Sequence, residues 1–271
     1  YGIDGSLSYA FNRAKDVNPG ISSTASTNYA GAATADPQRP GLATSNFEIK
    51  NSFKGRFSWT HEFFGDNKTN VTVFAELRSG LPFSYVYNVA NAATGIGLWG
   101  DAGAGGATSQ GRQLVYVPKA DSSGNVTLTS DPIVTYTTTG ASAVDIAALN
   151  AYLHSTGLIK YNGQISPRNG FKGDDVSRID VHLSQELPAF FPGGAKLLAY
   201  MDIVNIGNMI NDKWGVVEQF DFPQTTTILT PTIVGGRYNY ASFTPGIPTR
   251  GSSDAPNRSL WQLKFGLKYS F

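Results

Sequence analysis

A histidine and a serine stand two residues apart at His182 and Ser184. Residues two apart in a β-strand share a face, so the imidazole and the hydroxyl would lie on the same side of the chain. A histidine that activates a serine is an arrangement used for acyl hydrolysis. Here Gln185 follows the pair, and no third partner is evident. We therefore interpret both side chains as part of a polar strand face and keep a hydrolase as a remote alternative.

Two loops contain residue types that bind ligands elsewhere. Residues 95–100 match the dinucleotide-binding pattern Gly-x-Gly-x-x-Gly, but a Gly- and Ala-rich stretch follows them where that pattern needs a helix. Asp121 and the pair Asp174–Asp175 offer oxygen ligands for calcium, yet neither belongs to a twelve-residue loop with a closing Glu. The favoured interpretation is a flexible loop in the first case and turn residues in the second.

Composition narrows the class of protein. The 271 residues include no cysteine, which excludes thiol catalysis, disulfides and cysteine metal sites. Charged residues are 15% of the chain, below the usual quarter, and the net charge is +1 without any basic run, so nucleic acid is not an expected partner. The histidines share no metal-ligand spacing: His61, His154 and His182. The sequence predicts no catalytic residue, metal or cofactor.

Alternation of apolar and polar residues is the main structural signal. A strand turns successive side chains to opposite faces, so a period of two predicts ribbons with one apolar and one polar side. Six segments show this pattern: 1–12, 47–64, 69–87, 175–187, 195–208 and 258–271. In the last one the apolar positions are Trp261, Leu263, Phe265, Leu267, Tyr269 and Phe271. We therefore expect an all-β fold.

The connections between these segments differ in length. Residues 65–68 and 188–194 are short, whereas 13–46, 88–174 and 209–257 are long. If successive strands run in opposite directions, counting back from the C-terminus places both short connections at one end of the strands and all three long ones at the other end. Transmembrane β-barrels of the bacterial outer membrane have short periplasmic turns and long extracellular loops. This parity favours a transmembrane antiparallel β-barrel.

The longest loops are expected to have structure of their own. Helical spacing of apolar residues predicts a short helix over 142–156. Small hairpins are expected between 112–118 and 126–135, and between 214–222 and 227–240. Structured loops of this length are more often functional than idle.

A barrel interpretation assigns each strand face. The apolar face would meet lipid, with aromatic girdles at the headgroup levels, and the polar face would line the lumen. The expected girdle residues are Trp59, Phe63, Phe83, Tyr85, Tyr87 and Trp261. The expected polar wall of the lumen is Arg178, Asp180, His182, Glu186, Asp202, Lys264 and Lys268. The expected barrel-assembly signal, on the last strand, is Phe265, Leu267, Tyr269 and Phe271.

Several motifs resemble the Oar-like TonB-dependent outer-membrane receptors. They are Tyr116–Pro118, 163–170 with its Arg-Asn-Gly, Arg178–Asp180, Gln185–Glu186, Asp202–Asn208, Asn211–Gly215 with its Asn-Asp-Lys-Trp-Gly, and the terminal Phe271. The N-terminal third fits more loosely, through residues 8–10 and 78–84. The resemblance implies that residues 1–271 are the C-terminal portion of a 22-stranded barrel, since six strands alone cannot close a membrane barrel. It also implies an N-terminal plug and a TonB box, and neither motif is present in this sequence.

These observations favour a transport function in the outer membrane of a Gram-negative bacterium. The barrel would take up or move a bulky solute, with lipid and lipopolysaccharide around it, the TonB complex as its energy source, and a ligand or surface protein at the extracellular loops. Alternatives are a scaffold or anchor without transport and, remotely, an outer-membrane hydrolase. No run of about 18 apolar residues predicts a transmembrane helix, and no signal peptide is visible. Because Tyr1 falls at the start of a strand, we expect that it is not the native start.

Overall fold

The computed structural model describes residues 2–88, 112–141, 143–188, 195–220, 223–246, 249–250 and 259–270. Strands dominate, and the helices among these residues are short, so the all-β prediction is confirmed. The helices are α1 (Ala25–Gly31), α2 (Ile146–Ser155), the 3-10 helix η1 (Leu158–Tyr161) and α3 (Ile206–Ile210). None of these described helices has the length and apolar character needed to cross a membrane.

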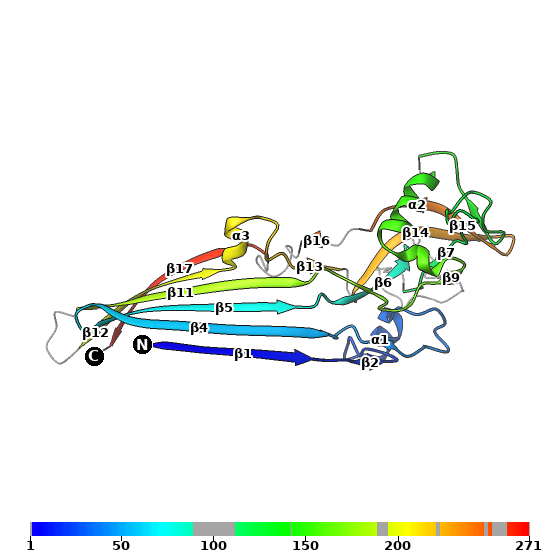
Figure 1. Cartoon of the computed structure of the whole chain (residues 1–271). Helices are drawn as coiled ribbons and strands as arrows, with labels where there is room; N and C mark the ends of the chain where they lie inside the picture. Colours follow the sequence, from blue (N-terminus) through cyan, green and yellow to red (C-terminus); the bar gives the residue numbers. More distant parts are fainter. Residues whose placement is uncertain are drawn as a thin grey trace.

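Six long strands form one antiparallel sheet in which every neighbour is the next long strand along the chain (Figure 1). Their order is β1 (Ile3–Phe11), β4 (Asn51–Phe64), β5 (Asn67–Arg78), β11 (Val176–Pro188), β12 (Lys196–Val204) and β17 (Gln262–Ser270). Each of the six alternating segments overlaps one of these strands. Over the described residues, β1 and β17 each pair on one side only, so the sheet is open.

The third alternating segment, 69–87, is not one strand, and that prediction is wrong. The chain leaves the six-stranded sheet after Arg78 and begins a separate strand, β6 (Pro82–Tyr87). Gly80 lies at the break, where an added Cβ would stand only 2.1 Å from the carbonyl oxygen of Gly173. A residue with a side chain would not fit between these two backbones, so the glycine allows the strand to end and the chain to turn away.

A second, five-stranded sheet lies beyond one end of the long strands (Figure 1). Its order is β10 (Phe171–Lys172), β6, β14 (Thr225–Val234), β15 (Arg237–Phe243) and β8 (Val134–Tyr136). With α2, η1 and the pair β7 (Tyr116–Val117) and β9 (Gln164–Ile165), it forms what we call the outer layer. The remaining short strands are β2 (Lys15–Asp16), β3 (Ala43–Thr44), β13 (Glu218–Gln219) and β16 (Thr249–Arg250).

The small hairpins differ from the expectation. Residues 112–118 do not pair with 126–135, because β7 pairs with β9 and β8 runs parallel to β15. The second hairpin is made within residues 225–243, by β14 and β15, with the turn at Gly235 and Gly236. Both glycines have positive φ angles of 59° and 75°, a conformation that favours glycine and permits the tight reversal. Helix α2 lies inside the segment 142–156.

The main hydrophobic core lies in the outer layer. Its buried residues come from β6, β14, β15 and α2, among other segments, and include Tyr87, Leu149, Leu153, Ile228 and Leu229, all at most 1% exposed. In the six long strands, by contrast, only Ser58 and Val176 are buried among the described residues. The protein therefore has a packed core in its loops and a long sheet with little cover on either face.

Candidate functional site

The apolar face of the long sheet is continuous across all six strands. The pairing register places Phe57, Val73, Val181, Ile203 and Leu263 side by side, one from each strand from β4 to β17. These side chains stay accessible, as the exposed fractions of 49% for Phe57 and 42% for Leu263 show. Exposed apolar residues on a protein surface are normally scattered singly, whereas here they form one extended surface. We call it the apolar face.

Aromatic residues mark both ends of this face. Near the outer layer, the rings of Tyr9 and Phe53 lie 4.4 Å apart. Near the tight turn between β4 and β5, the rings of Trp59 and Phe63 lie 5.5 Å apart. Trp261, just before β17, is 47% exposed.

The assignment of Phe83, Tyr85 and Tyr87 to a membrane girdle is wrong. All three belong to β6 and are at most 6% exposed, inside the core of the outer layer. Phe83 stacks on Phe220 at 4.1 Å between ring centroids, so its ring contacts protein. The physical reason is the strand break at Gly80, which sends β6 to a sheet whose neighbours cover both of its faces.

The expected assembly residues lie on an exposed edge. Phe265 and Leu267, on β17, are 71% and 72% exposed and belong to the apolar face, as does Tyr269 at 45%. Phe271 lies outside the described residues.

The opposite side of the long sheet is polar, and its ionisable side chains form hydrogen bonds and ion pairs along it. His182 Nδ1 lies 2.6 Å from Asp202 Oδ1, and Arg178 Nε donates to Asp180 Oδ1 at 2.9 Å. Glu186 contacts Lys196 at 3.3 Å, and Lys264 is the register partner of Asp202. All seven predicted wall residues occupy this face, with Lys268 opposite Leu198. Partly exposed pairs contribute at most about 1 kcal/mol each, so they neutralise the face more than they stabilise it.

The polar face does not assemble a hydrolytic site at His182. Its Nδ1 is held by Asp202, a partner that the sequence did not reveal because it lies on the neighbouring strand. Ser184 is two residues further along β11, about 6.6 Å at the usual strand rise. A base must lie within about 3.2 Å of the hydroxyl that it activates. No hydrogen bond joins Ser184 to His182 in the structure, and we propose no catalysis.

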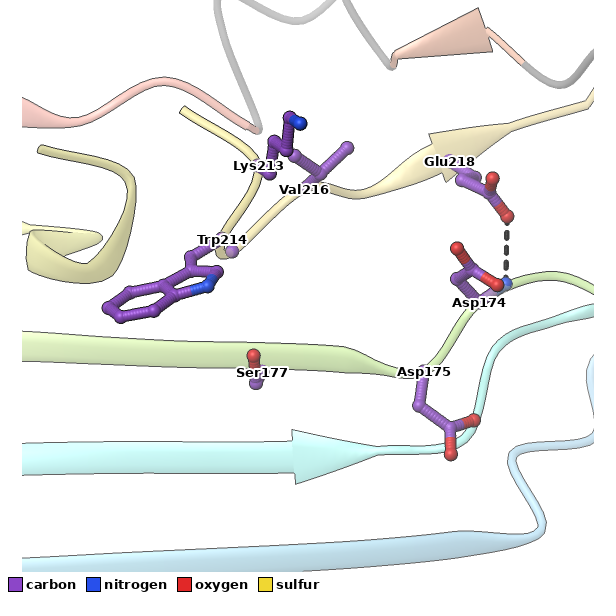
Figure 2. Close-up of a pocket in the computed structure, with 8 residues that line it drawn as sticks. Asp174, Asp175, Ser177, Lys213, Trp214, Val216 and Glu218 are labelled. Carbon is purple, nitrogen blue, oxygen red and sulfur yellow. Dashed lines mark hydrogen bonds between the residues drawn. The ribbon is translucent and has the colours of Figure 1, made fainter. Parts of the chain in front are cut away.

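A cleft of about 370 Å³ opens between the start of β11 and the segment after α3 (Figure 2). Asp174, Asp175 and Glu218 line it together with Lys213 and Trp214. Two of the three acidic side chains are already engaged: Glu218 accepts from the backbone N–H of Asp174 at 2.7 Å, and Asp175 accepts from the Lys172 ammonium at 2.6 Å. The Lys172 bond, joined by one from the Gly80 N–H, lowers the pKa of Asp175 below its usual value.

The calcium candidates therefore behave as structural turn residues. Asp121 accepts hydrogen bonds from the backbone N–H groups of Ser123 and Asn125, at 2.9 and 3.0 Å. Within the described residues, no group of three or more His, Cys, Asp or Glu side chains is arranged to hold a metal ion. The glycine pattern at 95–100 lies outside the described residues.

Buried tyrosines hold the outer layer together. The hydroxyls of Tyr87 and Tyr240 lie 3.1 Å apart, and Tyr240 also donates to the backbone oxygen of Tyr116 at 2.6 Å. The N–H of Tyr116 donates back to the Tyr87 hydroxyl at 2.9 Å, which closes the network. Burial raises the pKa of both Tyr87 and Tyr240 above the usual value, so both remain neutral. They act as polar links inside an apolar core.

A second cavity of about 500 Å³ lies beside the outer layer, beyond the end of β1. Several segments distant in sequence line it: Lys15 of β2, residues 33–35 and 40–44, Leu114, Tyr161 and residues 165–170. Arg168 ties the first part of the chain to this region, because its Nη1 donates to Asp16 Oδ1 at 2.8 Å and only 7% of its side chain is exposed. Sequence reasoning missed the cavity, since no spacing within any one segment signals it.

Asn169 explains part of the Arg-Asn-Gly motif. Its backbone has a positive φ of 52°, and its side chain donates to the backbone oxygen of Thr44 and to the side chain of Asn46. Its backbone N–H donates to Ser84 at 2.8 Å. The buried Asn169 thus joins β6, through Ser84, to β3 and the residues after it, through Thr44 and Asn46.

No protein-family model, curated protein or solved structure matches the chain. The fold and surface define the class as an all-β protein with a bare apolar sheet face. The resemblance to TonB-dependent receptors stays a prediction that rests on the motifs around Arg168 and Asn205.

Proposed function

We propose that this chain forms part of the wall of a transmembrane β-barrel in the outer membrane of a Gram-negative bacterium. The observation that carries the proposal is the uncovered apolar face. In water, a face of Phe, Leu, Ile and Val side chains across six strands would associate with any apolar surface. Lipid hydrocarbon chains around the apolar face would remove its contact with water. The polar face on the other side of the sheet suits a water-filled lumen.

The dimensions of the long sheet support this environment. Its strands have 9 to 14 residues, and a transmembrane strand needs about 9–11. From Phe53 to His61 the chain rises about 26 Å along β4, close to the height of about 25 Å of the apolar band in outer-membrane barrels. Toward the tight turn between β4 and β5 a polar row crosses this band, in which Thr69 donates to Gln185 at 2.5 Å beside His61.

The open edges support assembly with further strands. At an unpaired strand edge in hydrocarbon, the outward-facing backbone N–H and C=O groups have no hydrogen-bond partner, and each such group costs several kcal/mol. The outer edges of β1 and β17 therefore need partners, which the proposal assigns to the rest of one 22-stranded barrel. Its N-terminal plug would contact the polar face, where the hydrogen-bonded pair His182 and Asp202 lies.

Within that class, the proposed activity is TonB-dependent uptake of a bulky solute. The outer layer would capture the solute outside the cell, and the TonB complex would supply energy through the N-terminal region of the receptor. A scaffold or anchor for a surface protein is the alternative, because a barrel wall with folded loops would serve either role. A plug and a TonB box in the same polypeptide would favour transport. Mass spectrometry of the protein purified from outer membranes tests this: peptides from both segments support the receptor, and a barrel without them supports the anchor.

The topology can be tested in intact cells. A cysteine at Ser122, in an exposed turn of the outer layer, should react with a thiol reagent that cannot cross the outer membrane. A cysteine at Asp66, in the tight turn between β4 and β5, should react only after permeabilisation. Residues 1–271 contain no cysteine, so within them each label reports one position. The opposite pattern would invert the topology and remove the capture role of the outer layer.

A further inference from the structure

The cavity beside β2 combines one unpaired positive charge with an apolar lining. Its volume of about 500 Å³ is within the range of sites for small organic ligands. Leu42 and Ile165 line it and are 67% and 39% exposed, so apolar surface remains in contact with water there. A ligand with an apolar body would release that water, which is the main source of affinity in such sites.

The charges of the cavity favour an anion. Lys15 and Arg168 are the charged residues among its lining, and no Asp or Glu in the described part of the chain lines it. Arg168 is already neutralised by Asp16, at 2.8 Å and through a second bond to the Asp16 backbone oxygen. Lys15 has no ion pair among the described residues. The lining of the cavity therefore has one positive charge that no carboxylate neutralises, that of the Lys15 ammonium group.

The number of donors distinguishes among anions. A phosphate carries up to two charges and is usually held by several cationic or backbone donors. A single lysine ammonium matches one carboxylate, and the neighbouring Tyr161 and Leu114 offer ring and methyl surface for the rest of the ligand. The polar atoms of Ser166 point elsewhere, because its N–H donates to the Val115 oxygen and its hydroxyl to the Tyr85 oxygen.

We propose that this cavity binds an organic monocarboxylate with an apolar body, held by Lys15 at its charged end and by Leu42 along its chain. The proposal names the class of solute that the outer layer captures, and in that respect it rests on the proposed transport function. Binding itself needs only the folded outer layer and the segment 13–46 beside it. A failure of binding would thus leave the membrane topology untouched, and a failure of the topology test would leave the binding measurement valid.

A matched pair of fluorinated probes tests the proposal. The acid is 4-(4-fluorophenyl)butanoate, and its uncharged counterpart is the corresponding amide. Ligand-detected fluorine NMR would measure both against the intact protein in lipid nanodiscs, with empty nanodiscs as the blank. We expect the acid to bind at least roughly fivefold more tightly than the amide, since a partly exposed charge-assisted hydrogen bond is worth about that factor.

Three variants assign the contacts. Lys15→Gln should remove the preference for the acid and leave amide binding unchanged, whereas Leu42→Asp should weaken both probes. Lys50→Gln, the same change at an exposed lysine outside the cavity, should change neither. Heat-modifiable migration of each variant on gels confirms that it is folded. Equal binding of acid and amide, an equal loss in Lys50→Gln, or binding explained by empty nanodiscs would overturn the proposal.

Discussion

Placing an arginine at Val181 tests which face of β11 meets lipid. Val181 lies in the middle of the apolar face, between Val73 of β5 and Ile203 of β12. A charged side chain near the bilayer midplane costs about 2–4 kcal/mol on the lipid face of a barrel. That corresponds to a decrease of roughly 30- to 900-fold in the folding equilibrium constant. Titration with urea in lipid vesicles, followed by heat-modifiable migration, measures the loss.

The control is the next residue along the strand. His182→Arg places a cation on the polar face opposite Asp202, whose Oδ1 lies 2.6 Å from the imidazole Nδ1 of His182. Its effect on the free energy of unfolding should stay below about 1 kcal/mol, the scale of an exposed ion pair. Similar costs for Val181→Arg and His182→Arg would refute the assignment of the faces, as would a larger cost for His182→Arg.

Further predictions concern the outer layer. Leu149→Ala, at a fully buried position in α2, should destabilise the outer layer by about 2–5 kcal/mol and expose it to protease, while the strand fragments of the long sheet stay protected. Asp16→Asn leaves the nearly buried Arg168 without its carboxylate and should cost about 1–3 kcal/mol, seen as faster hydrogen exchange in residues 13–46; unchanged exchange would contradict the role of this pair. Burial raises the folded-state pKa of Tyr87 and Tyr240, so their contribution to stability is complete below about pH 10 and is lost as the pH rises through the raised values. Tyrosinate absorbance should therefore increase together with unfolding of the outer layer, and an increase in the folded protein near pH 10 from these two residues would contradict their burial.

Local patterns predicted the long sheet well because each strand has two chemically different faces. In β11, Ile179, Val181 and Leu183 alternate with charged and polar residues, and the register with β5 and β12 extends that alternation sideways. The same rule failed at 69–87. Phe83, Tyr85 and Tyr87 continue a period of two, but a pattern within a strand does not reveal which sheet receives it.

The arrangement of the outer layer could not be predicted, because it depends on contacts between residues far apart in the sequence. Gly80 ends β5 because the backbone of Gly173, far along the chain, approaches it closely. Asn169 joins Ser84 and Thr44 through hydrogen bonds across more than 80 residues of sequence. The cavity near Lys15 arises in the same way, from several segments brought together by folding. Helix α2 could be predicted, since its Asp145 cap and its buried Leu149 and Leu153 lie within one stretch.

The most direct test of the central claim is the environment of successive residues along β11. Single nitroxide labels from Ile179 to Ser184, in the protein reconstituted in a lipid bilayer, would be compared for collision with oxygen, which concentrates in hydrocarbon, and with a water-soluble nickel chelate. The account predicts a period of two, with oxygen contact highest at 179, 181 and 183 and chelate contact highest at 180, 182 and 184. Chelate contact at the odd positions, or no alternation, would contradict a membrane-facing apolar sheet.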